Sequence, residues 1–187
     1  MLILKDSKIQ IMQTLLKYIR YTFSLALLSF TVSSCLTAQE ASVKSNSYGF
    51  MLKSLLSHTV PEMNVPDAAE KPANTVFLDS RAREEYDVSH IKGARFVGYD
   101  NFSLDTVNDL PKTTPIVVYC SVGYRSEKIS EQLIAAGFEN VSNLYGGIFE
   151  WKNQGHTVVN PAGDTTDEVH AYNRTWGVWL KKGEKVY

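Results

Sequence analysis

A short apolar strand that runs into a cysteine-bearing loop and then into a helix is the feature that most constrains this chain. Residues 115–119 are apolar and rich in β-branched and aromatic side chains, which predicts a buried strand. Residues 126–136 carry apolar side chains at helical spacing and charged side chains on the other face. Cys120 is therefore expected in a loop that ends at a helix N-terminus.

The surroundings of Cys120 favour a reactive thiolate. Unpaired backbone N–H groups and the positive end of the helix dipole stabilise negative charge at a helix N-terminus. Arg125 adds a permanent positive charge. Gly123 permits a positive φ, which lets the loop amides turn inward around an anion. The alternative is a cysteine that acts only as a small buried apolar residue. The combination of loop, glycine, arginine and helix start disfavours it.

Four sequence blocks carry a resemblance to the rhodanese (sulfurtransferase) family. Residues 120–126 resemble its active-site loop, and residues 76–86 resemble its strand ending in Asp-x-Arg. Residues 90–94 are similar to its His-Ile-x-Gly-Ala turn, and residues 141–151 to its last strand, Gly-Gly turn and Trp-bearing helix. The blocks follow the family's order and spacing across about residues 60–159. The resemblance implies a single α/β domain with a mostly parallel sheet flanked by helices, and a site at the carboxyl ends of its strands.

The resemblance also implies sulfurtransferase chemistry. Cys120 would be the catalytic nucleophile, taking a sulfane sulfur from a donor such as thiosulfate and passing it to a thiol or cyanide. Arg125 would bind the anionic end of the donor, and Ser126 would cap the helix. No cofactor and no metal are expected. The substrate-binding loop would consist of Ser121, Val122, Gly123, Tyr124, Arg125 and Ser126.

Other charged residues in the matched blocks are implied to be structural. Asp79, Arg81 and His90 would support the strand ends and loops by hydrogen bonds and ion pairs, and Glu85 belongs to the same group. Ser89 departs from the family, which usually has Gly before the His. This departure lies outside the loop and leaves the chemistry unaffected.

Two other functions remain open. A non-catalytic persulfide carrier or binding module that serves a partner protein would also need Cys120. The related dual-specificity phosphatases have a longer Cys-to-Arg loop than the four residues present here, and this loop offers no acid for a leaving group. Sulfur transfer is therefore favoured over phosphatase chemistry. No basic residue stands between Cys120 and Arg125, which makes thiosulfate a poor donor.

The charge of the chain bears on its partners. The formal net charge of −1 over 187 residues gives nucleic-acid binding no electrostatic support. The expected partners are a small sulfur donor, an acceptor thiol and a sulfur-accepting protein, with no nucleic acid.

The N-terminal segment has the parts of an export signal. Lys17 and Arg20 precede an apolar run over residues 21–30, which is too short for a convincing membrane span. Residues 32–35 resemble a bacterial lipoprotein box, which predicts a signal peptide over 1–34 and a lipid on Cys35. The chain would then be a membrane-anchored lipoprotein of the cell envelope or periplasm. The alternatives are a secreted soluble protein or an uncleaved anchor.

The remaining segments flank the predicted domain. Residues 35–47 would be a lipidated flexible tether and residues 48–159 the rhodanese-like domain, with a helix near its start. Residues 160–187 would be a helical extension packed on the domain. Its predicted helix starts at Thr166 or Asp167, and its apolar positions repeat at helical spacing at Val169, Tyr172, Trp176 and Leu180.

Overall fold

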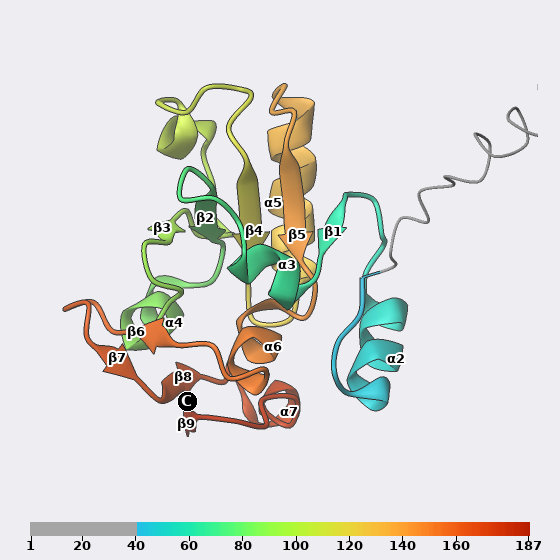
Figure 1. Ribbon diagram of the computed structural model, residues 1–187, viewed down its shortest axis with the longest axis vertical. Helices are drawn as coiled ribbons and strands as arrows, with labels where there is room; N and C mark the ends of the chain where they lie inside the picture. The colour runs from blue at the N-terminus through green and yellow to red at the C-terminus, as the bar shows by residue number, and fades with distance from the viewer. Residues whose placement is uncertain (1–40) are drawn as a thin grey trace, which may run out of the picture. The chain divides into compact units, whose positions relative to one another are not determined.

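A five-stranded parallel sheet in the order β1-β5-β4-β2-β3 organises the computed structural model, which describes residues 41–187 (Figure 1). The strands are β1 (Glu62–Met63), β2 (Val76–Asp79), β3 (Arg95–Phe96), β4 (Ile116–Tyr119) and β5 (Val141–Leu144). Helices cover both faces, which confirms the predicted α/β fold with a mostly parallel sheet flanked by helices.

Strand β4 is buried along its whole length because both faces of the sheet are covered. Val117 and Tyr119 point into one core, and Ile116 and Val118 point into the other. The first core also receives side chains from α2 (Asn46–Leu55), α3 (Val65–Ala69) and α6 (Gly147–Asn153). The second core receives side chains from α5 (Tyr124–Ala135) and the 3₁₀ helix η1 (Leu104–Val107). Helix α4 (Arg83–Val88) follows β2.

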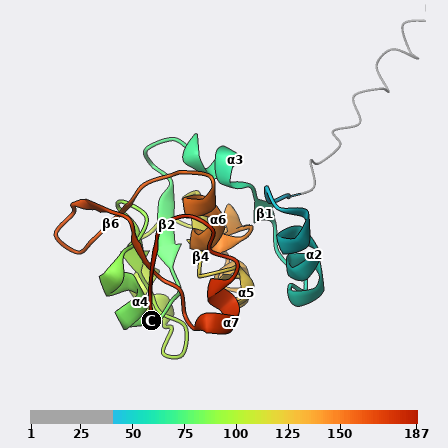
Figure 2. The same ribbon diagram turned by 90° about the horizontal axis from the view of Figure 1, so that it is seen from below.

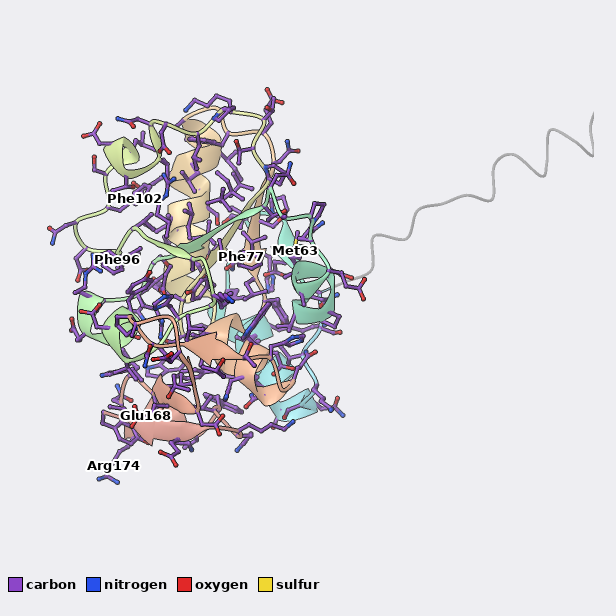
Figure 3. All side chains as sticks on the ribbon, turned by 60° about the vertical axis from the view of Figure 1, so that its left-hand side comes forward. Met63, Phe77, Phe96, Phe102, Glu168 and Arg174 are labelled. Carbon is purple, nitrogen blue, oxygen red and sulfur yellow. The ribbon has the colours of Figure 1, made fainter. Side chains whose placement is uncertain are left out.

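The strand register brings the carboxyl ends of β2, β4 and β5 to one end of the sheet. Asp79 lies opposite Tyr119, and Val118 lies opposite Asn143. The C-terminal segment lies at this end, with β8 and α7 below the strands in Figure 1 and in front of them in Figure 2. In Figure 3, Glu168 and Arg174 accordingly lie at the opposite end from Phe102. The loop that holds Cys120 therefore faces residues far along the chain.

The predicted C-terminal helix over residues 166–180 is wrong over most of its length. The segment instead forms β7 (Thr165–Thr166), β8 (Glu168–His170), the short helix α7 (Arg174–Gly177) and β9 (Glu184–Val186). Strand β7 pairs antiparallel with β6 (Val158–Val159), and β8 pairs parallel with β9.

The physical reason lies between residues 169 and 173. Val169 and Ala171 are both buried, which is the alternation of an extended chain. Tyr172 has a φ of 63°, which no right-handed helix accepts. Asn173 caps α7 by accepting from the N–H of Thr175, so the helix begins only there.

The predicted N-terminal features fall mostly outside the described residues. This applies to the signal peptide over 1–34, to Cys35 and to residues 36–40 of the tether. Among residues 41–187, no helix is both long and apolar enough to cross a membrane. The end of the tether is not free, because the N–H of Lys44 donates to Glu150 Oε1 (2.8 Å) and α2 begins at Asn46.

Candidate active site

Cys120 follows β4 directly and lies at the floor of a pocket, with 1% of its surface exposed. The N–H of Gly123 points back at the sulfur, 3.1 Å from Sγ. Gly123 achieves this with a φ of 122°, a conformation that a residue with a Cβ rarely adopts. The Ser126 hydroxyl lies 3.5 Å from the same sulfur. The Gly123 N–H stabilises negative charge on Sγ, as a nucleophilic thiolate requires.

Ser126 does not cap the helix as predicted. Gly123 is the N-cap residue of α5, and the Ser126 hydroxyl lies inside the first turn. That hydroxyl is 2.7 Å from Asn143 Oδ1 and 3.1 Å from the carbonyl oxygen of Gly123. Asn143 Nδ2 donates to the same carbonyl (3.0 Å). The sequence reasoning missed Asn143, although an amide inside an otherwise apolar strand marks a buried hydrogen-bonding role.

Arg125 is held by a partner that the sequence did not indicate. Its Nη1 donates to Glu85 Oε2 (2.6 Å) and its Nη2 to Glu85 Oε1 (2.9 Å), a bidentate ion pair. The Ser121 hydroxyl accepts from Arg125 Nη2 (3.0 Å) and donates to Glu85 Oε1 (2.9 Å). The guanidinium is therefore committed to Glu85 instead of being free for an anionic ligand.

The protonation of this pair follows from burial and contact. Burial by itself raises the pKa of Glu85, but the hydrogen bond and charge of Arg125, together with the N–H of Ala82, bring that pKa below its ordinary value. Burial by itself lowers the pKa of Arg125, and the hydrogen bond to Glu85 and the nearby Cys120 sulfur raise it overall. Both groups are charged at neutral pH.

The start of α6 packs directly on the backbone of the cysteine loop. The N–H groups of Ile148 and Phe149 donate to the carbonyl oxygens of Cys120 (2.9 Å) and Ser121 (3.2 Å). A Cβ at Gly147 would lie 2.3 Å from the Cys120 carbonyl oxygen. This close approach explains the Gly-Gly turn at that point of the sequence.

Asp79, Arg81 and His90 lie away from the pocket. Asp79 and Arg81 form a fully buried ion pair with Nη2–Oδ2 at 2.7 Å, and Arg81 Nη2 also donates to the carbonyl oxygen of Ser89 (2.6 Å). The His90 ring stacks on Tyr86, with 3.9 Å between ring centroids. None of the three lines the pocket.

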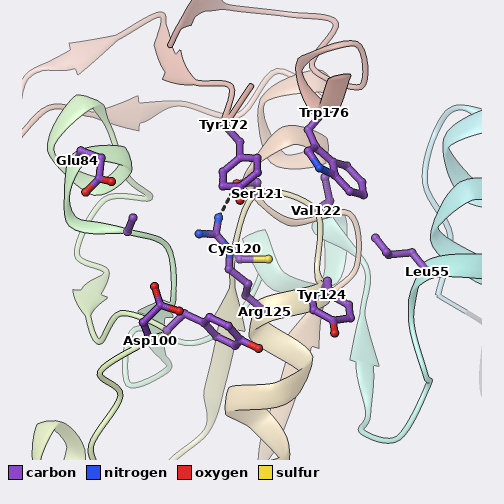
Figure 4. A pocket seen from close by; sticks show the side chains of 12 residues that line it. Leu55, Glu84, Asp100, Cys120, Ser121, Val122, Tyr124, Arg125, Tyr172 and Trp176 are labelled. Atoms are coloured by element: carbon purple, nitrogen blue, oxygen red, sulfur yellow. Dashed lines mark hydrogen bonds between the residues drawn. The ribbon is translucent and has the colours of Figure 1, made fainter. Parts of the chain in front are cut away.

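The pocket above Cys120 has a volume of about 550 Å³ and a largely aromatic wall (Figure 4). In the close view, the sulfur lies in the middle, with Tyr172 and Trp176 on one side and Tyr124 on the other. The lining residues are Leu55, Ala82, Glu84, Tyr99, Asp100, Cys120, Ser121, Val122, Tyr124, Arg125, Tyr172 and Trp176. Within the predicted loop, Ser121, Val122, Tyr124 and Arg125 line it, whereas Gly123 and Ser126 support the sulfur from below.

Several lining residues lie outside the motifs that predicted the site. Tyr172 and Trp176 come from the C-terminal segment, and Leu55 comes from α2. The available signal was the aromatic spacing after residue 160, which we interpreted as a helix packed on the domain.

Comparison with known proteins agrees with this geometry. The family profile described as the rhodanese-like domain matches residues 65–154, which include the whole cysteine loop. Residues 65–154 form a rhodanese-like domain.

Solved structures share the fold. The protein BH2092 from Bacillus halodurans is 24% identical with a TM-score of 0.51, covering 63% of this chain and 86% of that one. A thiosulfate sulfurtransferase from Pseudomonas aeruginosa is 23% identical with a TM-score of 0.52, covering 64% of this chain and 23% of that one. At these identities, the likeness supports the fold and no particular reaction.

The relatives that match the rhodanese-like domain in sequence are not named as sulfurtransferases. The tRNA uridine(34) hydroxylase of Pectobacterium atrosepticum is 38% identical over 87 residues, covering 43% of this chain and 24% of the relative. The enzyme of that name from Staphylococcus epidermidis is 41% identical over 87 residues, covering 43% of this chain and 27% of the relative. The chain thus spans about a quarter of the length of these relatives.

The predicted sulfurtransferase function is wrong, because these relatives are named as tRNA hydroxylases and not as thiosulfate sulfurtransferases. The persulfide-carrier alternative is withdrawn with it. The structure supplies a physical reason, since Arg125, the predicted donor-binding cation, is neutralised by Glu85. The relatives' name also specifies tRNA, which conflicts with the prediction that this chain has no nucleic-acid partner.

The Glu85–Arg125 pair predicts a pH-dependent stability. Glu85→Gln leaves Arg125 without its carboxylate and should lower the free energy of unfolding by about 3 kcal/mol at pH 7. Because the pKa of Glu85 is lowered in the folded chain, its contribution is full above its ordinary value of 4.5 and is lost as the pH falls further. The difference in stability between variant and wild type should therefore shrink below about pH 4.5.

Urea unfolding across this pH range measures the difference in free energy of unfolding between Glu85→Gln and the wild-type chain. Asp109→Asn, which removes the partner of Arg95 in an exposed ion pair, is the control and should change stability little at any pH. A Glu85→Gln deficit that stayed constant down to pH 3 would show that the carboxylate charge contributes nothing.

Proposed function

We propose that the rhodanese-like domain is an enzyme in which Cys120 attacks an electrophilic atom of an uncharged group of its substrate. One observation carries this proposal. The sulfur sits at the pocket floor, with the Gly123 N–H 3.1 Å away, while the guanidinium beside it is bound to Glu85. A nucleophile stabilised by a fixed N–H donor suits covalent catalysis.

The charges around the pocket support an uncharged substrate. Among its lining residues Arg125 is the cation, and its charge is balanced by Glu85. Glu84 and Asp100 add two carboxylates at exposed positions of the rim. A small dianion would meet net repulsion there.

The name of the relatives supports a uracil ring as the substrate group. Uracil is neutral and planar, and its C6 is electrophilic because the C5=C6 double bond is conjugated with the C4 carbonyl. The Cys120 thiolate would form an S–C6 bond while the π electrons of C5=C6 move toward O4. Water would then protonate C5, and removal of a proton from C5 with cleavage of the S–C6 bond would regenerate uracil and thiolate. The cycle is balanced and consumes no other reactant.

This mechanism predicts exchange of the uracil C5 hydrogen with solvent. In D₂O, the wild-type chain should exchange the H5 signal of uridine, followed by NMR, and Cys120→Ser should exchange it only at the uncatalysed rate. Asp109→Asn, which changes an exposed ion pair outside the pocket, should exchange it like wild type.

The experiment uses free uridine first and a uridine-containing RNA hairpin second. Exchange by Cys120→Ser at the wild-type rate, or the absence of exchange with both substrates, would contradict the proposed addition.

We further propose that the chain is a membrane-anchored lipoprotein with its domain outside the cytoplasm. The support is the basic stretch, the apolar run over 21–30 and the sequence Val32-Ser33-Ser34-Cys35. Several acyl chains on Cys35 would hold it firmly on a bilayer. An exported domain would meet nucleosides or RNA fragments, which is the reason to test free uridine first.

Fractionation of a bacterial host tests this location. The wild-type chain should be found in the membrane fraction with Cys35 as its first residue, and Cys35→Ser should be unprocessed or released. Cys120→Ser is the matched control, because it removes the other cysteine and should stay in the membrane. Identical fractionation of wild type and Cys35→Ser, with an amino terminus other than Cys35, would mean that a plain signal or anchor is present.

A further inference from the structure

We propose that Tyr172 and Trp176 form a stacking wall that selects planar, uncharged rings for Cys120. Both residues lie outside residues 65–154, which the family profile matches. The inference rests on the proposed function and deepens it, because it names the class of substrate and the residues that recognise it.

Tyr172 is held in an unusual conformation beside the site. Its φ of 63° lies in the left-handed region, which a bulky residue adopts only when its surroundings fix it. Its N–H donates to His170 Nδ1 (3.1 Å), and the Arg125 guanidinium lies 5.2 Å from its ring centroid. Tyr172 nevertheless remains 49% exposed. An aromatic ring fixed on one side and open on the other offers a surface for stacking.

Trp176 is positioned by the cap of α7. The Asn173 side chain accepts from the N–H groups of Thr175 (3.0 Å) and Trp176 (3.1 Å), which fixes the short helix directly after Tyr172. Trp176 is partly buried against the core that α2 and α6 share. In Figure 4 its indole lies next to Val122, and Trp176 lines the same pocket as Cys120.

The segment that carries both rings is fastened to the domain at several points. The Ser89 hydroxyl donates to the carbonyl oxygen of Glu168 (2.6 Å), and Asn153 Nδ2 donates to that of Trp179 (2.9 Å). Lys152 Nζ contacts Asp167 Oδ1 at 2.6 Å. Ser89 is the residue that departs from the glycine of the family pattern, and its hydroxyl makes a bond that glycine could not make. The wall is therefore a fixed part of the pocket.

The other walls fit a flat, neutral ring. Tyr124 stands across the sulfur from the two aromatic side chains in Figure 4, and Leu55 and Val122 close the far side with apolar surface. Aromatic faces stack on planar rings whatever their substituents. A puckered ring loses most of its contact with such a face. Glu84 and Asp100 on the rim disfavour anionic ligands.

The test compares uridine with 5,6-dihydrouridine, which keeps the carbonyl and N–H groups but has a puckered ring. Binding is measured by calorimetry with the full chain carrying Cys120→Ser, so that no chemistry intervenes. Uridine should bind at least about tenfold more tightly than dihydrouridine, because stacking is lost with planarity.

Further substitutions in the Cys120→Ser chain identify the residues that cause the preference for uridine over dihydrouridine. Tyr172→Leu and Trp176→Leu should each reduce the preference several-fold, while Tyr172→Phe should retain it. Phe50→Leu, which changes an aromatic residue that is 76% exposed and lies outside the pocket, is the control and should retain it. Thermal unfolding of each variant verifies folding, and Tyr172→Phe keeps the test valid if a leucine variant is unstable.

Equal binding of the two nucleosides, no binding of either, or a preference unchanged in both leucine variants would overturn the stacking wall. The outcome is separable from the proposed reaction. Preferential binding of uridine without C5 exchange by the wild-type chain would support the stacking wall and refute the addition of Cys120 to uracil. C5 exchange without preferential binding of uridine would support the addition and refute the stacking wall.

Discussion

The ion pair between Arg125 and Glu85 sets both the shape and the charge of the pocket. It joins the first turn of α5 to α4, two segments that are 40 residues apart in the sequence, and it includes the Ser121 hydroxyl next to the cysteine. Glu85 is 1% exposed, so removing either partner would strand a charge in a nearly dry environment. The same pair cancels the positive charge of Arg125, which the loop sequence predicts as a site for an anion. What remains above the sulfur is a chamber lined mainly by aromatic and apolar groups.

The part of the fold nearest Cys120 could be predicted from local sequence. The apolar run before the cysteine and the helical spacing after it are complete signals within about twenty residues, and β4 and α5 lie where they indicate. The two glycines at 146 and 147 could also be assigned to a turn. Their tight packing on the Cys120 carbonyl became visible only in three dimensions.

The C-terminal segment could not be predicted in this way, because its structure depends on distant partners. Strand β8 pairs with β9, which follows about fifteen residues later, and neither strand has an alternation long enough to outweigh the helical spacing of Val169, Tyr172, Trp176 and Leu180. The function was misjudged for a related reason. The loop motif predicts a reactive cysteine, whereas the charge and the walls of the pocket above it depend on Glu85, Tyr172 and Trp176, which the motif does not include. Residues that act on the same pocket from separate parts of the chain leave no joint signal in a single sequence.

The central claim is that Cys120 is a nucleophile in a pocket that prefers uncharged reactants. The rates at which iodoacetamide and iodoacetate alkylate the full-length chain test it most directly, with mass spectrometry of the Cys120 peptide as the readout. The two reagents react by the same displacement and differ in charge. The account predicts that Cys120 prefers iodoacetamide by about tenfold more than a free thiol does. It also predicts that replacing both Glu84 and Asp100 by their amides narrows this preference. Alkylation by iodoacetate as fast as or faster than by iodoacetamide would show a pocket that attracts anions, and would contradict the account.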